Sequence, residues 1–181
     1  MKIRDLVFMS FFVALATAGA FLKLPLPFMS VTFQLFFAIL AGIILGPVRG
    51  LIAMAVYMLI GLTGVPVFTL GGGPGYVLQP SFGFILGFLP AAYISGLVYE
   101  KSGIERKYAV YPAYITGMLA AYLIGIPYLF LILKFYIKNP ETTILSVIVS
   151  MLIYIAKDAV LGLVLFLFAG HIPVLKKFAG N

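Results

Sequence analysis

Six apolar stretches, separated by short polar or glycine-rich links, dominate this sequence. They run over Leu6 to Leu22, Phe33 to Leu45, Val48 to Ile60, Phe82 to Val98, Val110 to Leu133 and Ile144 to Phe168. A helix that crosses a bilayer takes roughly 20 apolar residues, and the links leave no room for a separate soluble domain. The pattern predicts an all-α integral membrane protein, a bundle of six transmembrane helices in which residues 1–181 form a single transmembrane domain.

Composition and charge agree with a chain surrounded by lipid. Hydrophobic residues make up 64% of the sequence and charged residues only 9%, too few to cover a water-exposed surface. The net charge of +7 is no sign of nucleic-acid binding, because the basic residues gather on one side of the expected topology. With a cytoplasmic N-terminus, only Lys23, Lys134 and Lys138 lie outside, whereas eight basic residues lie inside: Lys2, Arg4, Arg49, Lys101, Arg106, Lys107, Lys176 and Lys177. Both termini are therefore expected in the cytoplasm.

The first apolar stretch permits two interpretations. Lys2 and Arg4 precede an apolar run that ends in Ala18-Gly19-Ala20, as in a cleavable signal peptide. The run is long for that purpose, however, and it carries small residues four apart, Ala14 with Ala18 and Ala16 with Ala20. Such ridges let transmembrane helices approach closely, which favours a retained first helix.

A glycine-rich segment follows the third stretch and holds Gly71-Gly72-Gly73-Pro74-Gly75. It lacks the Gly-Lys-Ser or Gly-Lys-Thr ending of a nucleotide-binding P-loop, so it predicts no ATP hydrolysis by that route. We expect an extracellular loop. The nearby aromatic residues favour a lid over an apolar ligand, and a plain flexible connector is the alternative: Phe68, Tyr76, Phe82 and Phe84.

Two ionisable residues, Lys157 and Asp158, fall inside an apolar stretch, where a charge costs roughly 2.5 to 3.5 kcal/mol. Tyr154 lies one helical turn before them, so the three predict one polar patch. Successive helical residues point about 100° apart, so we expect that the two charges cannot fully pair with each other and that the patch binds a ligand. A self-neutralising pair that only fixes helix packing is the alternative.

Other polar residues give weaker signals. Gln34 and Gln79 lie near the expected outer surface, where an amide either contacts a ligand or simply faces the interface. His171, the one histidine, lies at the inner end of the last stretch without a partner motif, and we expect a structural or solvated role. The chain has no cysteine, which excludes disulfides, thiolate zinc sites and thiol nucleophiles.

The segments around the glycine-rich run carry a resemblance to a known family. The sequence from Gly61 to Phe68, the run from Gly71 to Gly75 and the sequence from Gln79 to Phe88 resemble the BioY pattern G-x-x-G-x-P-V-F, a glycine-rich stretch and G-P-T-G-G-Y-L-x-G-F. Upstream, Pro25-Leu26-Pro27 and Val31-Thr32-Phe33-Gln34 look like the family's P-x-P and P-[IV]-T-x-Q elements, and Ala14 with Ala18 looks like its A-x-x-x-A coupling motif.

Departures from the family pattern fall close to the expected ligand. Gln79 stands where the family usually has glycine and Ser81 where it has threonine, and three further positions differ, Ser30, Phe82 and Phe84. In the last stretch Asp158 matches the family's aspartate, but Leu161 replaces the lysine three residues later. Lys157 lies on the same helix face as Leu161, about 6 Å along the axis, so its long stem could carry the charge back to that place.

The resemblance implies a function and partners. It implies biotin uptake by the high-affinity biotin-binding S component of an energy-coupling-factor (ECF) ABC transporter, with biotin as the transported ligand, no cofactor and no enzymatic activity. The implied partners are an ECF transmembrane coupling subunit, which would contact Ala14 and Ala18, the ATP-binding subunits and membrane lipid; a homo-oligomer is compatible with this. The expected location is the plasma membrane, which the chain crosses several times. The expected substrate-binding residues are Gln34, Phe68, Tyr76, Gln79, Tyr154, Lys157 and Asp158.

Three other functions are kept as alternatives. Another vitamin or vitamin precursor is the nearest, because of the departures beside the ligand. An integral membrane enzyme acting on lipid would need more histidines or acids near the interface than this chain offers. A purely structural subunit would need neither the glycine-rich loop nor a buried charge.

Overall fold

A computed structural model describes residues 2–23 and 30–169 of the chain, and this part contains helices and loops but no β-strand. Each of the six apolar stretches forms a helix. Their bounds are α1 Ile3–Phe21, α2 Gln34–Leu45, α3 Pro47–Leu62, α4 Phe82–Lys101, α5 Arg106–Leu131 and α6 Ile144–Ala169. A short 3₁₀ turn, η1 (Pro74–Leu78), lies in the glycine-rich loop, and α5 ends in a π-helical turn, η2 (Ile132–Tyr136).

Helix length separates two groups. The apolar helices α1, α4, α5 and α6 are each long enough to cross a membrane, whereas α2 has 12 residues and α3 has 16. At about 1.5 Å per residue, α2 is about 18 Å long, well short of a hydrocarbon core of about 30 Å. The described residues therefore form an all-helical bundle of six helices, of which four are long and apolar enough to cross a membrane.

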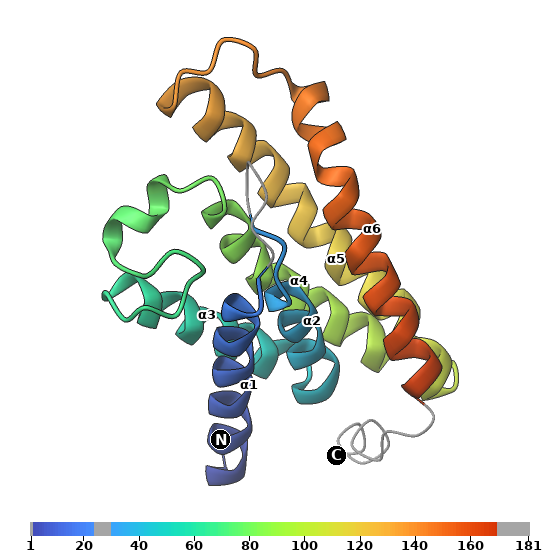
Figure 1. Ribbon diagram of the computed structural model, residues 1–181. Helices are drawn as coiled ribbons and strands as arrows, with labels where there is room; N and C mark the ends of the chain where they lie inside the picture. Colours follow the sequence, from blue (N-terminus) through green and yellow to red (C-terminus); the bar gives the residue numbers. More distant parts are fainter. Residues whose placement is uncertain (1, 24–29, 170–181) are drawn as a thin grey trace.

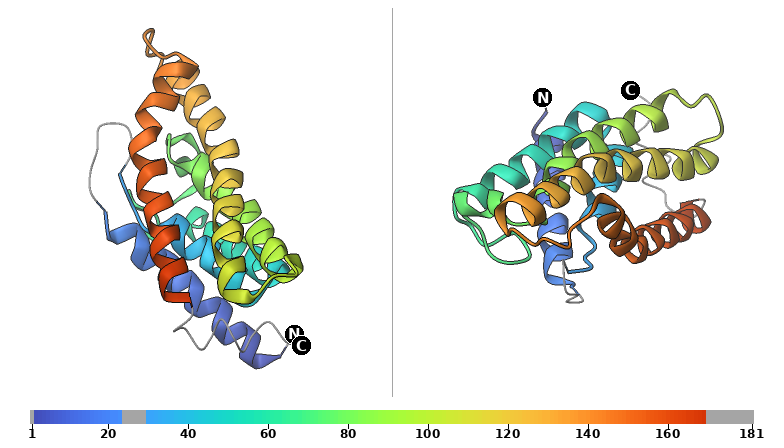
Figure 2. Two further views of the ribbon diagram at one scale, coloured as in Figure 1. Left: turned by 90° about the vertical axis from the view of Figure 1, so that its right-hand side faces the viewer. Right: turned by 90° about the horizontal axis from the view of Figure 1, so that it is seen from above.

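Small residues allow the central helices to approach closely. Helix α4 packs against α2, α3 and α5, and Figures 1 and 2 show it in the interior of the bundle. A Cβ atom at Gly42 of α2 would meet the backbone of α4 at Ala92, and one at Gly87 of α4 would meet α5 at Ala121. In lipid, helices associate through such close contacts, because the solvent itself is apolar.

The last helix shows which solvent surrounds the bundle. Helix α6 packs chiefly along α5, and the side chains on its other faces are large, apolar and exposed from Leu145 to Phe168. A water-soluble protein would not expose a continuous apolar face of this length. With four helices of spanning length, the chain is a multi-pass membrane protein.

The basic residues gather at one end of the bundle. The start of α1, the turn between α2 and α3 and the connection between α4 and α5 lie together at this end, while the connection between α5 and α6 lies at the other (Figure 1). An ion pair of 3.6 Å between Arg49 and the buried Asp5 joins the starts of α3 and α1 there. Of the residues interpreted above, Pro25, Leu26, Pro27, His171, Lys176 and Lys177 lie outside the described part of the chain.

Candidate ligand-binding site

A pocket opens where the segment before α2, the glycine-rich loop and helices α4, α5 and α6 meet. It encloses about 720 Å³ of space not filled by atoms, part of which is open to solvent. Its polar lining is Ser30, Thr32, Gln34, Thr69, Tyr76, Gln79, Ser81, Tyr122, Tyr154, Lys157 and Asp158. Its apolar lining is Leu35, Leu70, Pro80, Phe84, Ile85 and Phe88.

One end of the pocket is charged. The Asp158 side chain, on a residue that is 2% exposed, has its Oδ1 2.5 Å from Nζ of Lys157, and its Oδ2 accepts a hydrogen bond of 2.8 Å from the hydroxyl of Tyr122 on α5. Lys157 also donates a 2.7 Å hydrogen bond to the backbone carbonyl of Thr32. The buried carboxylate is thus compensated on both oxygens, which a charge inside a membrane requires.

The expectation that Lys157 and Asp158 cannot fully pair is wrong. Their Cα atoms do leave the helix in different directions, but the four-carbon stem of lysine carries its ammonium group back to the neighbouring carboxylate. The same stem places Nζ beside Thr32, two residues before the start of α2. The pair therefore does more than neutralise itself on one helix, because it joins α6 to the segment that precedes α2.

A second polar group, next to the charged end, is neutral. Gln34, at the first turn of α2, accepts hydrogen bonds on Oε1 from the hydroxyls of Thr32 (3.2 Å) and Thr69 (3.1 Å). Its Nε2 donates to the hydroxyl of Tyr57 on α3 at 2.5 Å, and Tyr57 donates onward to the carbonyl of Val67 at 2.9 Å. These bonds join α2, α3 and the glycine-rich loop in one buried network.

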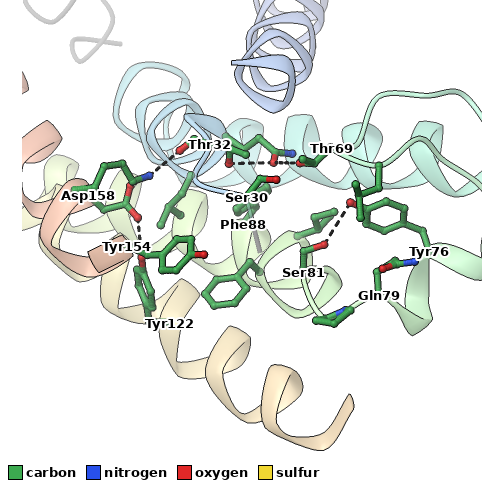
Figure 3. Close-up of a pocket in the computed structure, with 17 residues that line it drawn as sticks. Ser30, Thr32, Thr69, Tyr76, Gln79, Ser81, Phe88, Tyr122, Tyr154 and Asp158 are labelled. Atoms are coloured by element: carbon green, nitrogen blue, oxygen red, sulfur yellow. Dashed lines mark hydrogen bonds and ion pairs between the residues drawn. The ribbon is translucent and has the colours of Figure 1, made fainter. Parts of the chain in front are cut away.

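The glycine-rich loop forms the wall opposite the charged end. The hydroxyls of Tyr76 and Ser81 lie 3.3 Å apart, and Figure 3 shows both, with Gln79, across the pocket from Asp158, Tyr122 and Tyr154. Between the two walls lies an apolar patch that includes Phe88. A ligand that fits this lining has an apolar body and polar groups at its ends or edges.

Comparison with known proteins identifies the family to which the chain is similar. The model of the BioY family matches residues 1–179. A probable biotin transporter BioY of Lysinibacillus sphaericus is 41% identical over 134 residues, which cover 74% of this chain and 68% of the relative. The biotin transporter BioY of Thermotoga maritima is 34% identical over 138 residues, 75% of this chain and 78% of that protein.

This chain belongs to the BioY family. The resemblance of its loop and upstream elements to the BioY pattern is thereby confirmed. A crystal structure of the S-component for biotin from an ECF-type ABC transporter has the same fold, with a TM-score of 0.71 over 99% of this chain and 93% of that one. The two sequences are 21% identical, so this likeness concerns the fold.

Most of the residues expected to bind substrate meet at the pocket of this BioY protein. Six of the seven line it: Gln34, Tyr76, Gln79, Tyr154, Lys157 and Asp158. Phe68 does not, because its fully buried ring lies beneath the loop, 5.5 Å from the ring of Tyr57 and 4.5 Å from that of Tyr76. Phe68 supports the wall of the pocket instead of facing into it.

The loop itself is bound to the helices at several points. The ring of Phe68 occupies the space above Gly61 that a Cβ atom would fill, and Gly73, at φ +109°, donates a 2.7 Å backbone hydrogen bond to the carbonyl of Gly61. On the far side Tyr128 of α5 donates to the carbonyl of Val77. Glycine is needed at both positions, one for space and one for a positive φ, and these contacts pack the loop against the helices.

Four polar residues in or behind the pocket were not predicted to take part in the site. Tyr57, Tyr122 and Thr69 were not named, and Thr32 was named only within the Val31-Thr32-Phe33-Gln34 element, although all four hydrogen-bond to Gln34 or Asp158. Tyrosine and threonine are common in membrane helices and loops, and nothing in their spacing distinguishes these from interfacial residues. Their roles follow only from their hydrogen-bond partners, which lie on other segments of the folded chain or, for Thr32, two residues away.

The small residues of α1 divide between two faces. Ala14 and Ala18 are exposed, whereas Ala16 and Ala20 are buried against the bundle, where α1 packs on α2 and α3. The buried pair serves packing within the chain. The exposed pair leaves a flat strip free on the surface of α1, as a close contact with another helix requires.

Proposed function

We propose that this BioY protein takes up biotin across the cytoplasmic membrane as the high-affinity biotin-binding S component of an ECF-type ABC transporter. The observation that carries the proposal is the compensated carboxylate of Asp158 in the wall of a pocket that also has an apolar patch. Its support from outside the chain is membership of a family whose relatives are named as biotin transporters. It assigns the chain to transport, without catalytic residues or a cofactor.

The chemistry of biotin suits the two walls. Biotin has a ureido ring with two N–H donors and a carbonyl, an apolar sulfur-containing ring, and a carboxylate on a short chain. Asp158 accepts from the ureido N–H groups and Lys157 meets a carbonyl or the carboxylate. Tyr76, with Tyr154, covers the apolar ring, and Gln34 and Gln79 add hydrogen bonds at its edges.

The placement of the chain in the membrane follows from the distribution of charge. The basic end of the bundle faces the cytoplasm, so that both termini are cytoplasmic and the glycine-rich loop is extracellular. All six helices lie within the bilayer; the short α2 lines the pocket with Gln34 and Leu35, and the short α3 supports Gln34 through Tyr57. The whole chain acts as a single transmembrane domain surrounded by lipid.

Delivery of biotin inward requires partners, because the chain has no nucleotide-binding motif. The exposed strip at Ala14 and Ala18 contacts the transmembrane coupling subunit, which connects to ATP-binding subunits. Association with a second copy of this chain is compatible with the same surface.

A second candidate ligand is another vitamin or vitamin precursor. It is favoured by Gln79 and Ser81, which line the pocket at positions where BioY proteins usually have glycine and threonine. Gln79 brings an additional amide to the wall that faces Asp158, and Ser81 keeps a hydroxyl there but lacks the methyl group of threonine.

Ligand-dependent thermal stabilisation of the purified protein distinguishes these functions from a structural role. A ligand at 100 times its Kd stabilises the folded state by about 2.7 kcal/mol. We expect biotin to raise the unfolding temperature and thiamine, as a control, to leave it unchanged. A shift with another vitamin alone would support the second candidate, and no shift with any vitamin would support a scaffold.

A further inference from the structure

The hydrogen bonds around Tyr57 determine the orientation of the side-chain amide of Gln34, that is, which side its nitrogen and its oxygen face. A tyrosine hydroxyl has one proton, and a backbone carbonyl can only accept. The proton of Tyr57 is donated to the carbonyl of Val67 at 2.9 Å, so the hydroxyl oxygen must accept from Gln34, 2.5 Å away. The atom of Gln34 that faces Tyr57 is therefore the nitrogen.

The other end of the amide is then determined as well. With its nitrogen held by Tyr57, Gln34 turns its carbonyl oxygen to Thr32 and Thr69, whose hydroxyls donate to it. Both threonine protons are used, so toward a ligand these hydroxyls act as acceptors. Among the described residues only Tyr57 accepts from the amide nitrogen, which leaves its second N–H as a donor at the pocket.

We propose that Tyr57 is a positioning residue that sets the hydrogen-bonding polarity of the pocket through Gln34. Tyr57 is fully buried on α3 and does not itself line the pocket. It acts by excluding the flipped amide, in which a carbonyl oxygen would face the lone pairs of the tyrosine oxygen. The site then presents the acceptors of Thr32 and Thr69 beside one donor of Gln34 to the ligand. This inference rests on the proposed function, since biotin is the ligand used to test it.

The test is a double-mutant cycle on biotin affinity, measured by equilibrium binding to purified protein. Tyr57→Phe keeps the ring packed against Phe68 and removes only the hydroxyl. We expect it to weaken biotin binding about three- to tenfold, the range for one neutral hydrogen bond. In a Gln34→Met background the same substitution should change affinity less than about twofold, because the amide that it orients is gone.

The competing explanation is that Tyr57 only anchors the loop at Val67. In that case the loss caused by Tyr57→Phe would persist at full size in the Gln34→Met background, and the inference would be overturned. Affinities too weak for direct titration are measured by competition with radiolabelled biotin. Wild-type protein is titrated first, because absence of biotin binding there refutes the proposed function, whereas an additive cycle refutes only the role of Tyr57.

A second comparison covers the case in which Gln34→Met does not fold. Tyr128→Phe also removes a hydroxyl that anchors the glycine-rich loop, at Val77, but has no contact with Gln34. We expect Tyr128→Phe to weaken biotin less than about twofold, while Tyr57→Phe weakens it about three- to tenfold. Equal losses in the two variants would show that loop anchoring is the whole effect.

Discussion

The two polar groups of the pocket are held in different ways. Gln34 is hydrogen-bonded to side chains from the segment before α2, from α3 and from the glycine-rich loop, and its partner Tyr57 is fully buried in the core. Asp158 lies on α6, which packs chiefly on α5, and its partners are the neighbouring Lys157 and one tyrosine of α5. The neutral group is part of the packed scaffold, whereas the charged group lies on a helix with few neighbours.

Because of this difference, we expect substitutions at the two groups to affect different properties, the stability of the protein in one case and its affinity for the ligand in the other. A network built into the core is costly to disturb but has little freedom to adapt to a ligand. A charged group on a peripheral helix can exchange internal hydrogen bonds for bonds to a ligand at lower cost. We therefore expect substitutions behind the neutral group to lower stability most, and substitutions at the charged group to lower affinity most.

The largest effect is expected for Phe68→Ala, behind the neutral group. Removal of this fully buried ring empties the space between Tyr57 and Tyr76 and should destabilise the protein by about 3–5 kcal/mol. The measurement is the unfolding temperature in detergent. Phe168→Ala, at a side chain that is 60% exposed, is the matched control and should change stability by less than about 1 kcal/mol. Unchanged stability of Phe68→Ala would mean that the loop is a loose lid.

The next effect concerns the charged group. Asp158→Asn should weaken biotin about ten- to a hundredfold, since hydrogen bonds to a charged partner contribute about 1.5–3 kcal/mol. Asparagine has one side-chain oxygen in place of two, so that Lys157 and Tyr122 are left with a single, uncharged acceptor. Thermal stability is measured beside affinity, because an unpaired Lys157 in a low-dielectric site could unfold the protein. A folded variant that binds biotin within about threefold of wild type, less than 1 kcal/mol, would make this group structural.

A smaller loss is expected for Lys157→Met. Asp158 keeps its hydrogen bond from Tyr122, and the variant no longer bears the entropy cost of ordering the long lysine stem, which offsets part of the lost contact. We expect biotin affinity to fall less than about tenfold. Calorimetric titration of Lys157→Met beside Asp158→Asn ranks the two, and the reverse order would make the lysine the principal anchor.

No change in affinity is expected from Ala14→Trp and Ala18→Trp, which lie outside both groups on the exposed strip of α1. Transport, in contrast, should be abolished, because bulk on this strip prevents the approach of a partner helix. Binding to purified protein and uptake by cells are compared at equal expression. Ala16→Trp, on the buried face, is the matched control and should lower stability. Normal uptake with both exposed substitutions would assign the strip to another role.

The sequence predicted the helices well and the contacts between them poorly. The apolar stretches identify all six helices, and the length of α2 and α3 is the one feature that separates them from full spans. Asp158 and Lys157 could be found because charge in an apolar stretch is rare. Tyr57 and Tyr122 could not, because their roles depend on Gln34, 23 residues away, and Asp158, 36 residues away.

Two errors have the same origin. Phe68 was expected to face the ligand because it lies in the loop, and Lys157 was expected not to pair fully because of its helical direction. In both cases the direction of the side chain depends on a contact with another element. The ring of Phe68 packs against Gly61 of α3, and the ammonium group of Lys157 binds the carbonyl of Thr32 before α2. Sequence spacing gives the position of a residue along its own element and no more.

The proposed function depends most directly on the affinity of the purified, unmodified chain for biotin. Titration calorimetry in detergent measures it without partners or ATP. We predict a saturable heat with one biotin per chain and a Kd well below micromolar, as expected for a pocket with a compensated charge and a preformed polar wall. No heat and no thermal shift with biotin, together with a clear response to another vitamin, would contradict the assignment and transfer it to that ligand.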